Sequence, residues 1–244
     1  MSQLTVQLLR KHSPRPRPGR WSERFAAIAD RLVAVYGTPA LGNFRDPVAE
    51  IFYIVLSART TDAQYRQTHR ELRDQFPRLA DLAAAPLDEI LSCIRRGGLA
   101  NKRAGQVRRI AQRILADLGS RPKARLKAMP AAEVYRFLTG LPGMGPKSAL
   151  CVMMYSLNFD VFPVDVNVRR VARRLGAIPS GLKHYRAQQR LPSLVPDGRS
   201  KELHIGLVVL GRTVCLPRTP HCDRCPINDL CRVGRARLAR PGGV

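Results

Sequence analysis

Four cysteines near the end of the sequence constrain the fold of that part of the chain more than any other feature does. Cys215, Cys222, Cys225 and Cys231 are separated by six, two and five residues, and the segments between them are polar or turn-forming. Four thiolates on one short segment suit a tetrahedral Zn²⁺ ion or an iron–sulfur cluster. The sequence therefore predicts a loop folded around a metal centre, and the spacing alone leaves the choice between zinc and iron open.

The chain is strongly basic. It has 244 residues and a formal net charge of +24, because 42 lysines and arginines face 18 aspartates and glutamates. Net charge indicates partners rather than fold, and the phosphate backbone of nucleic acid is the commonest polyanionic partner. A ribosome-like protein or a membrane-surface binder would also be basic. A membrane partner is disfavoured because no long basic helix opposes a wide apolar face, and no apolar run approaches a transmembrane length.

The first 20 residues are rich in arginine and proline and lack the apolar segment of a secretory signal. Prolines at alternate positions of the sequence KHSPRPRPGR disfavour both helix and strand, so we expect residues 1–20 to be a flexible basic arm. An intracellular protein, in the cytoplasm or nucleoid, is expected. Disulfides are disfavoured there, and Cys93 and Cys151 are expected to be buried thiols of the core.

Apolar residues recur at helical spacing through the remaining chain, and no β-hairpin pattern or internal repeat is present. Ser22 is the predicted N-cap of a helix that ends at Gly37, and Asp46 with Pro47 begins another helix. The sequence predicts an all-α fold. Further helices are expected around the stripe Val107, Ile110, Ile114 and Leu118, which Gly119 terminates, and after Pro130, Pro146 and Asp165.

Between two predicted helices lies the segment LPGMGPK, residues 141–147. Gly143 and Gly145 permit positive φ and a close approach of another backbone. The segment leads into a helix N-terminus, where unpaired N–H groups and the helix dipole favour an anion. A plain turn between helices would explain the glycines alone. The flanking Leu-Pro and the adjacent Lys147 favour a turn that binds a phosphate of duplex DNA.

The segment LPGMGPKSA resembles the helix-hairpin-helix element of the endonuclease III family of DNA glycosylases. The stretch Phe162-Pro163-Val164-Asp165 resembles the family segment that follows it, and the cysteine spacing resembles the family's [4Fe–4S] site. The resemblance covers nearly all of the chain except the arm. It implies two domains: residues 40–160 with the hairpin, and residues 21–39 plus 161–244 with the cluster. It also selects [4Fe–4S] over zinc as the cofactor.

The resemblance assigns the chemistry to Lys147 and Asp165. A neutral Lys147 would attack the sugar C1′, expel the base and form a Schiff base, after which β-elimination would nick the strand. Asp165 would stabilise the charged sugar and accept a proton. The alternatives are a phosphate-binding lysine at a helix start and a helix N-cap aspartate, and Asp165 can be both cap and catalyst.

The resemblance also indicates the residues that contact DNA: Arg59 and Leu99 fill the gap left by a flipped base, Gly143 and Gly145 bind a phosphate, and Arg218 projects from the cysteine loop. Three positions depart from the family pattern. Arg59 replaces a usual glutamine, Ala100 a common aromatic residue, and Asn167 a frequent histidine. A changed set of lesions is expected from these departures.

Together these features predict a monomeric base-excision-repair glycosylase with AP-lyase activity on damaged, oxidised pyrimidines or abasic sites in double-stranded DNA. A glycosylase for mismatched or deaminated pyrimidines with weak lyase activity is the first alternative, and a non-catalytic damage-binding protein is the second.

Overall fold

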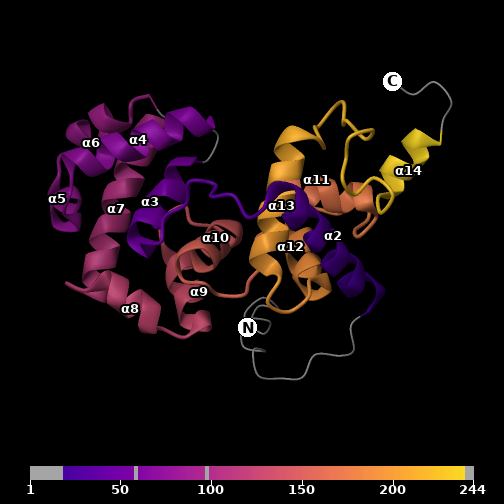
Figure 1. Cartoon of the computed structure of the whole chain (residues 1–244). Helices are drawn as coiled ribbons and strands as arrows, with labels where there is room; N and C mark the ends of the chain where they lie inside the picture. Colours follow the sequence, from indigo (N-terminus) through magenta and orange to yellow (C-terminus); the bar gives the residue numbers. More distant parts are fainter. Residues whose placement is uncertain (1–18, 58–59, 97–98, 240–244) are drawn as a thin grey trace. The chain divides into compact units, whose positions relative to one another are not determined.

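The computed structural model describes residues 19–57, 60–96 and 99–239 of the chain. These residues form helices joined by turns, and they contain no strand, which confirms the all-α prediction. The chain divides into two compact units (Figure 1). One unit comprises residues 43–159, and the other combines residues 1–42 with residues 160–244. The expected basic arm, residues 1–20, lies almost wholly outside the described residues.

The unit of residues 43–159, here called the hairpin unit, is built on two helices. Helix α3 (Pro47–Ser57) is buried almost all round, and Asp46 caps it by accepting a hydrogen bond from the Val48 N–H at 3.0 Å. Helix α7 (Ala100–Leu118) buries the predicted apolar stripe and ends at Gly119, where φ is +64°. The helices packed against these two are α4 (Asp62–Gln75), α5 (Leu79–Ala84), α6 (Leu87–Ile94), α8 (Pro122–Ala128) and α10 (Pro146–Ser156), and α9 (Ala131–Gly140) packs against α10.

The second unit, here called the cysteine unit, is centred on α13 (Ser200–Thr213), which packs against α2 (Arg20–Tyr36) and α11 (Val166–Leu175). Gly206 lets α2 approach α13 closely, because a Cβ there would lie 2.8 Å from the Cβ of Leu32. Helix α2 is thus part of the core of the C-terminal third. The remaining elements are α12 (His184–Arg190), a short 3₁₀ helix η2 (Leu191–Leu194) and α14 (Arg232–Leu238).

Two local predictions were wrong. Helix α2 begins at Arg20 with Gly19 at the N-cap, so Ser22 lies inside the first turn rather than before it. The Gly19 carbonyl accepts the Ser22 N–H at 2.7 Å and thereby starts the helix earlier. Cys151 is buried as expected, but Cys93 is only half-buried, because it lies on the less covered side of α6.

Within the described ranges, no helix combines the length and apolar character needed to cross a membrane.

Candidate active site and cysteine loop

The hairpin turn, residues 141–145, connects α9 to α10 through a tight β-turn. The Leu141 carbonyl accepts the Met144 N–H at 3.1 Å, with Pro142 and Gly143 at the two central positions. Gly143 has a φ of +71°, as the second central residue of a type II turn requires. Leu141 and Met144 are buried and anchor the turn, whereas Gly143 is exposed. The turn therefore presents its glycine outward from an apolar base.

Gly145 differs from the prediction. Its φ is −81° in an extended conformation, so it acts as the N-cap of α10 without needing positive φ. A Cβ at Gly145 would meet no atom within 4 Å in the protein. Within the hairpin unit, neither backbone strain nor crowding thus demands glycine here. A close approach of an external backbone, as expected at a phosphate-binding turn, remains a reason for it.

Lys147 occupies the second position of α10, directly after Pro146. It is half-buried at the helix start. Its positive charge reaches Glu50 on α3, a residue that the sequence analysis did not identify. Glu50 is fully buried, and its carboxylate accepts hydrogen bonds from the Asn43 side chain at 2.5 Å and the Phe44 N–H at 2.8 Å. Burial raises the pKa of Glu50 to about 7, while these two hydrogen bonds and the Lys147 charge oppose the rise.

Leu99 precedes α7 in a conformation that non-glycine residues rarely adopt, with φ at +61°. Its side chain is 52% exposed, which is unusual for a large apolar residue. Leu99 borders a hollow of about 590 Å³, whose other lining residues are Leu91, Arg95, Ala100, Asn101 and Lys102. The small Ala100 side chain contributes to this open space. The strained, exposed Leu99 fits the wedge role that the resemblance implies.

The other predicted wedge residue, Arg59, lies outside the described residues. The residues on either side of it are tied to α7 by Arg103, which is almost wholly buried. Arg103 donates to the Leu56 carbonyl at 2.8 Å and to the Thr60 hydroxyl at 3.1 Å. Helix α7 therefore holds Leu56 and Thr60 in place.

In the cysteine unit, Asp165 is the N-cap of α11, as predicted, and its carboxylate accepts the Val168 N–H at 2.7 Å. The approach to Asp165 is fixed by the buried Gln188, which accepts the Val164 N–H at 2.8 Å and donates to the Phe162 carbonyl at 3.0 Å. Sequence reasoning missed Gln188, because a glutamine more than twenty residues downstream gives no local signal of this pairing.

A chain of hydrogen bonds connects Asp165 to the first cysteine. Asn167 donates to the second Asp165 oxygen at 3.0 Å and accepts from Arg170 at 2.8 Å. Arg170 in turn donates to the Cys215 carbonyl at 2.8 Å. Asn167, noted from the sequence only as a departure from the family pattern, is thus the link between the candidate catalytic carboxylate and the cysteine loop.

The cysteine loop, residues 215–231, folds by successive turns, in which the N–H groups of Cys225, Asn228 and Cys231 each donate to a carbonyl three residues earlier. All four cysteines are free of disulfides. The pKa of the Cys225 thiol is raised to about 11, chiefly by burial and to a smaller extent by the charges of the other three cysteines. Arg174 donates to the Cys215 sulfur at 3.1 Å.

These residues fit an iron–sulfur cluster. They offer four free thiols on one short loop and an arginine N–H that donates to the Cys215 sulfur, and such clusters use thiolate ligands and hydrogen bonds to sulfur. Across the described ranges, no three His, Cys, Asp or Glu side chains are grouped to hold a metal ion.

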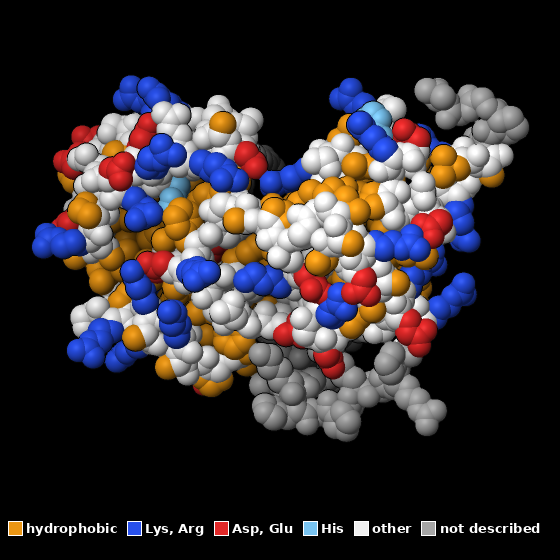
Figure 2. Space-filling model, in the orientation of Figure 1, with side chains coloured by type: hydrophobic (Ala, Val, Ile, Leu, Met, Phe, Trp, Pro, Cys, Tyr) orange, Lys and Arg blue, Asp and Glu red, His pale blue; other side chains and the backbone are white. Residues whose placement is uncertain are grey.

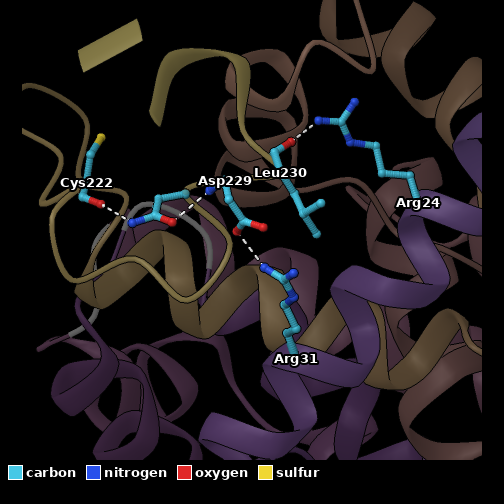
Figure 3. Close-up of polar contacts among 6 residues, drawn as sticks. Arg24, Arg31, Cys222, Asp229 and Leu230 are labelled. Atoms are coloured by element: carbon cyan, nitrogen blue, oxygen red, sulfur yellow. Dashed lines mark hydrogen bonds and ion pairs between the residues drawn. The ribbon is translucent and has the colours of Figure 1, made fainter. Parts of the chain in front are cut away.

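Helix α2 holds the loop between Cys225 and Cys231 (Figure 3). Arg24 donates to the Leu230 carbonyl, and Arg31 forms an ion pair with Asp229. The Asn228 side chain donates to the Cys222 carbonyl at 3.2 Å, which ties the loop to itself. Arg218, predicted to contact DNA, is exposed on the same loop. Lys and Arg side chains are spread over the visible surface of both units (Figure 2).

Lys147 and Asp165 belong to different units, with Lys147 in the hairpin unit and Asp165 in the cysteine unit. The hairpin turn, Lys147 and Leu99 share the first unit. Asp165, Arg218 and the four cysteines share the second.

Two family models match the chain. Residues 52–196 match the model of the HhH-GPD superfamily base excision DNA repair proteins, and residues 215–231 match the iron–sulfur binding domain of endonuclease III. The chain belongs to the HhH-GPD superfamily. The predicted family resemblance is therefore confirmed, and the protein is a member of a DNA glycosylase family of base excision repair.

Individual relatives fall into more than one activity class. Endonuclease III of Bacillus subtilis is 29% identical over 193 residues, which cover 79% of this chain and 84% of the relative. Thymine/uracil-DNA glycosylase of Methanothermobacter thermautotrophicus is 28% identical over 190 residues, covering 77% and 82%. A solved endonuclease III–DNA covalent intermediate superimposes with a TM-score of 0.76 at 24% identity, covering 89% of this chain and 98% of that one. This last likeness confirms the fold.

Proposed function

We propose that this protein is a bifunctional DNA glycosylase, which removes oxidised pyrimidines from duplex DNA and cleaves the resulting abasic site through Lys147. The observation that carries the proposal is the position of Lys147 at the second residue of α10, in the helix that begins just after a type II turn with an exposed glycine. A phosphate bound at the turn would bring the adjacent sugar towards the lysine. The matches to the superfamily and to endonuclease III support this assignment.

The proposed reaction begins with attack of the neutral Lys147 amine on the sugar C1′. The N–C1′ bond forms as the glycosidic bond breaks, and the base leaves with the bonding electrons and takes up a proton. Loss of an amine proton and opening of the sugar ring give a Schiff base. Removal of a C2′ proton then expels the 3′ phosphate and nicks the strand. The protein must supply a proton acceptor and stabilise positive charge on the sugar.

Asp165 is the proposed partner in this reaction. A carboxylate held by the Val168 N–H and the Asn167 amide is fixed in orientation, which suits stabilisation of a developing cation. We propose that Cys215, Cys222, Cys225 and Cys231 hold a structural [4Fe–4S] cluster. The cluster would stabilise the loop and take no part in the reaction. The braced loop would present Arg218 to a DNA phosphate. We further propose that the protein acts as a monomer inside the cell, in the cytoplasm or nucleoid.

Borohydride trapping on an abasic-site duplex tests the proposal, because reduction converts the Schiff base into a stable adduct. We expect an adduct with the wild type and none with Lys147→Ala. Lys127→Ala, which removes an exposed lysine from α8 of the same unit, is the control and should trap like the wild type. A folded wild type that binds the duplex but forms no adduct would contradict the lyase mechanism and would leave a binding protein without catalysis.

A second function is supported by a different observation, the similarity to thymine/uracil-DNA glycosylase. Thymine-DNA glycosylase of Aeropyrum pernix is also 29% identical over 220 residues, covering 85% of this chain and 94% of the relative. Arg59 offers a charged, bidentate donor in place of glutamine, and Ala100 leaves open space beside Leu99. Release of thymine or uracil from mismatched duplexes, with no release of oxidised pyrimidines, would replace the proposed substrate class with this one.

A further inference from the structure

The hairpin turn is held from outside by Gln106 of α7. The Gln106 side-chain nitrogen donates to the Pro142 carbonyl at 2.7 Å. A carbonyl oxygen can only accept a hydrogen bond, so the amide nitrogen must face it. The two residues are 36 positions apart in sequence. The bond is therefore a tertiary contact that joins α7 to the centre of the turn.

Gln106 and Gly143 are also in close contact. A Cβ at position 143 would overlap the Gln106 amide nitrogen and lie 2.9 Å from its Cδ. Any larger residue would have to displace the glutamine as well as adopt a positive φ. Glycine in the turn and glutamine on α7 thus form a matched pair, and the turn conformation depends on both.

One side of α7 carries two residues that hold other segments of the hairpin unit, in line with Leu99 at the start of the helix. Leu99, Arg103 and Gln106 are spaced by four and then three residues, the spacing that places side chains along one side of a helix. Leu99 is the N-cap of α7 itself, Arg103 holds the residues on either side of positions 58 and 59, and Gln106 holds the hairpin turn. Each segment is one for which the resemblance implies contact with DNA.

We propose that Gln106 is a positioning residue for DNA binding, which fixes the hairpin turn in the conformation that receives a phosphate. The inference rests on the proposed function, since it assumes that the turn binds duplex DNA. The physical reason is preorganisation. A peptide unit that is already fixed before binding loses less conformational entropy when a phosphate arrives. Gln106 fixes the Pro142–Gly143 peptide unit, whose neighbours lead directly into the N-terminus of α10.

Gln112 provides a matched control on the same helix. Its side chain also donates to a backbone carbonyl, that of Ala83 at 3.0 Å, away from the hairpin turn. Replacing each glutamine by methionine keeps the length and helix propensity of the side chain but removes the donor. Gln106→Met and Gln112→Met therefore delete the same kind of bond from the same helix at two places, in the full-length protein.

The experiment measures the Kd of each variant for a duplex that contains a tetrahydrofuran abasic-site analogue, together with the thermal midpoint and borohydride trapping on a natural abasic duplex. We expect Gln106→Met to bind about tenfold more weakly, a typical consequence of losing one well-placed hydrogen bond. Gln112→Met should bind within about twofold of the wild type. Similar thermal midpoints for the two variants would exclude general destabilisation as the cause.

Equal duplex affinity of Gln106→Met and the wild type would overturn the inference, as would an equal loss of affinity in both variants. These outcomes are distinct from failure of the proposed function. If the wild type forms no trapped adduct while Gln106→Met alone weakens binding, the lyase mechanism fails and the positioning role stands. If the wild type does not bind the duplex at all, both proposals fail.

Discussion

Asp165 has a structural task in addition to its proposed chemistry, because its carboxylate caps α11. An asparagine at this position keeps an acceptor for the Val168 N–H but loses the negative charge, whereas an alanine loses both. We expect Asp165→Asn and Asp165→Ala to lose trapping activity to a similar extent. Asp165→Ala should be less stable than Asp165→Asn by about 1 kcal/mol, the usual worth of a helix cap. Urea unfolding and trapping rates check this, and an asparagine variant with full activity would exclude a catalytic carboxylate.

Glu50 and His69 give a second prediction, concerning pH. Burial raises the pKa of Glu50 to about 7 and lowers the pKa of His69 to about 4. Between about pH 4.5 and 7, Glu50 is still protonated in the native state but already ionised in the unfolded chain. The stability of the native state therefore falls through this group as the pH rises. Between about pH 6.5 and 4 the unfolded chain protonates His69 first, so this group lowers stability as pH falls. Each effect is about 3 kcal/mol, and the two nearly cancel where they overlap.

Glu50→Gln should remove the Glu50 contribution to the pH dependence of stability. We expect the stability of the variant to rise with pH between about 4 and 6.5, by about 3 kcal/mol, because His69 then acts alone. The wild type should be nearly flat over the same range. Urea unfolding at a series of pH values measures both profiles. Parallel profiles for the two proteins would show that Glu50 does not titrate in this range.

A substitution at Leu99 is expected to weaken DNA binding without lowering the stability of the protein. Its positive φ is strained, and its side chain is half-exposed and gains little from packing. Leu99→Gly relieves the strain, so we expect stability to be unchanged or higher by up to about 1 kcal/mol. Binding to an abasic-analogue duplex should weaken, because the apolar wedge is gone. A matched replacement at another exposed apolar residue, Leu87→Gly at the first position of α6, should lower stability slightly without this loss of binding, because glycine adds conformational freedom to the unfolded chain and relieves no positive φ there.

At the scale of the helix, the sequence was informative wherever a signal was local. The stripe from Val107 to Leu118 and the Asp46 and Asp165 caps were predicted, because periodicity and capping depend on residues within one or two turns. The start of α2 was missed. Serine is a favourable N-cap residue, but the N-cap is Gly19, three residues before Ser22. Trp21, which packs on Phe25, therefore already lies in the first turn of the helix.

Helix α2 and the cysteine loop are joined by two arginines that differ in surroundings. Arg24 donates to a backbone carbonyl in a partly buried contact, whereas the Arg31–Asp229 pair has side chains 44% and 55% exposed. Solvent screens the exposed pair, so we expect Arg31→Ala to cost less than about 0.5 kcal/mol. Arg24→Ala should cost about 2 kcal/mol, because a charged donor is lost and a carbonyl is left unpaired. Thermal unfolding compares the two, and equal losses would mean that the ion pair is not screened as its exposure implies.

At the scale of the whole molecule, the sequence suggests the proposed reacting groups but not the residues that support them. Lys147, Asp165 and the four cysteines are recognisable because each lies in a short motif. Their supporting residues, Gln106, Gln188 and Arg170, bond to backbone groups 24 to 45 positions away. Such pairings depend on how helices pack, and no pattern within one segment indicates them.

The last prediction concerns the net charge of the entire chain, which is +24. Residues 1–18 contribute four of its cations, Arg10, Lys11, Arg15 and Arg17. Their removal should weaken duplex binding mainly at low salt, where interactions with phosphates are least screened. The slope of log K against log salt should decrease by at most about 3.6, if each of the four cations contacts one phosphate. Thermal stability should not change, since the core of the cysteine unit begins at Phe25. Equal affinities of the truncated and full-length proteins at low salt would show that the arm takes no part in binding.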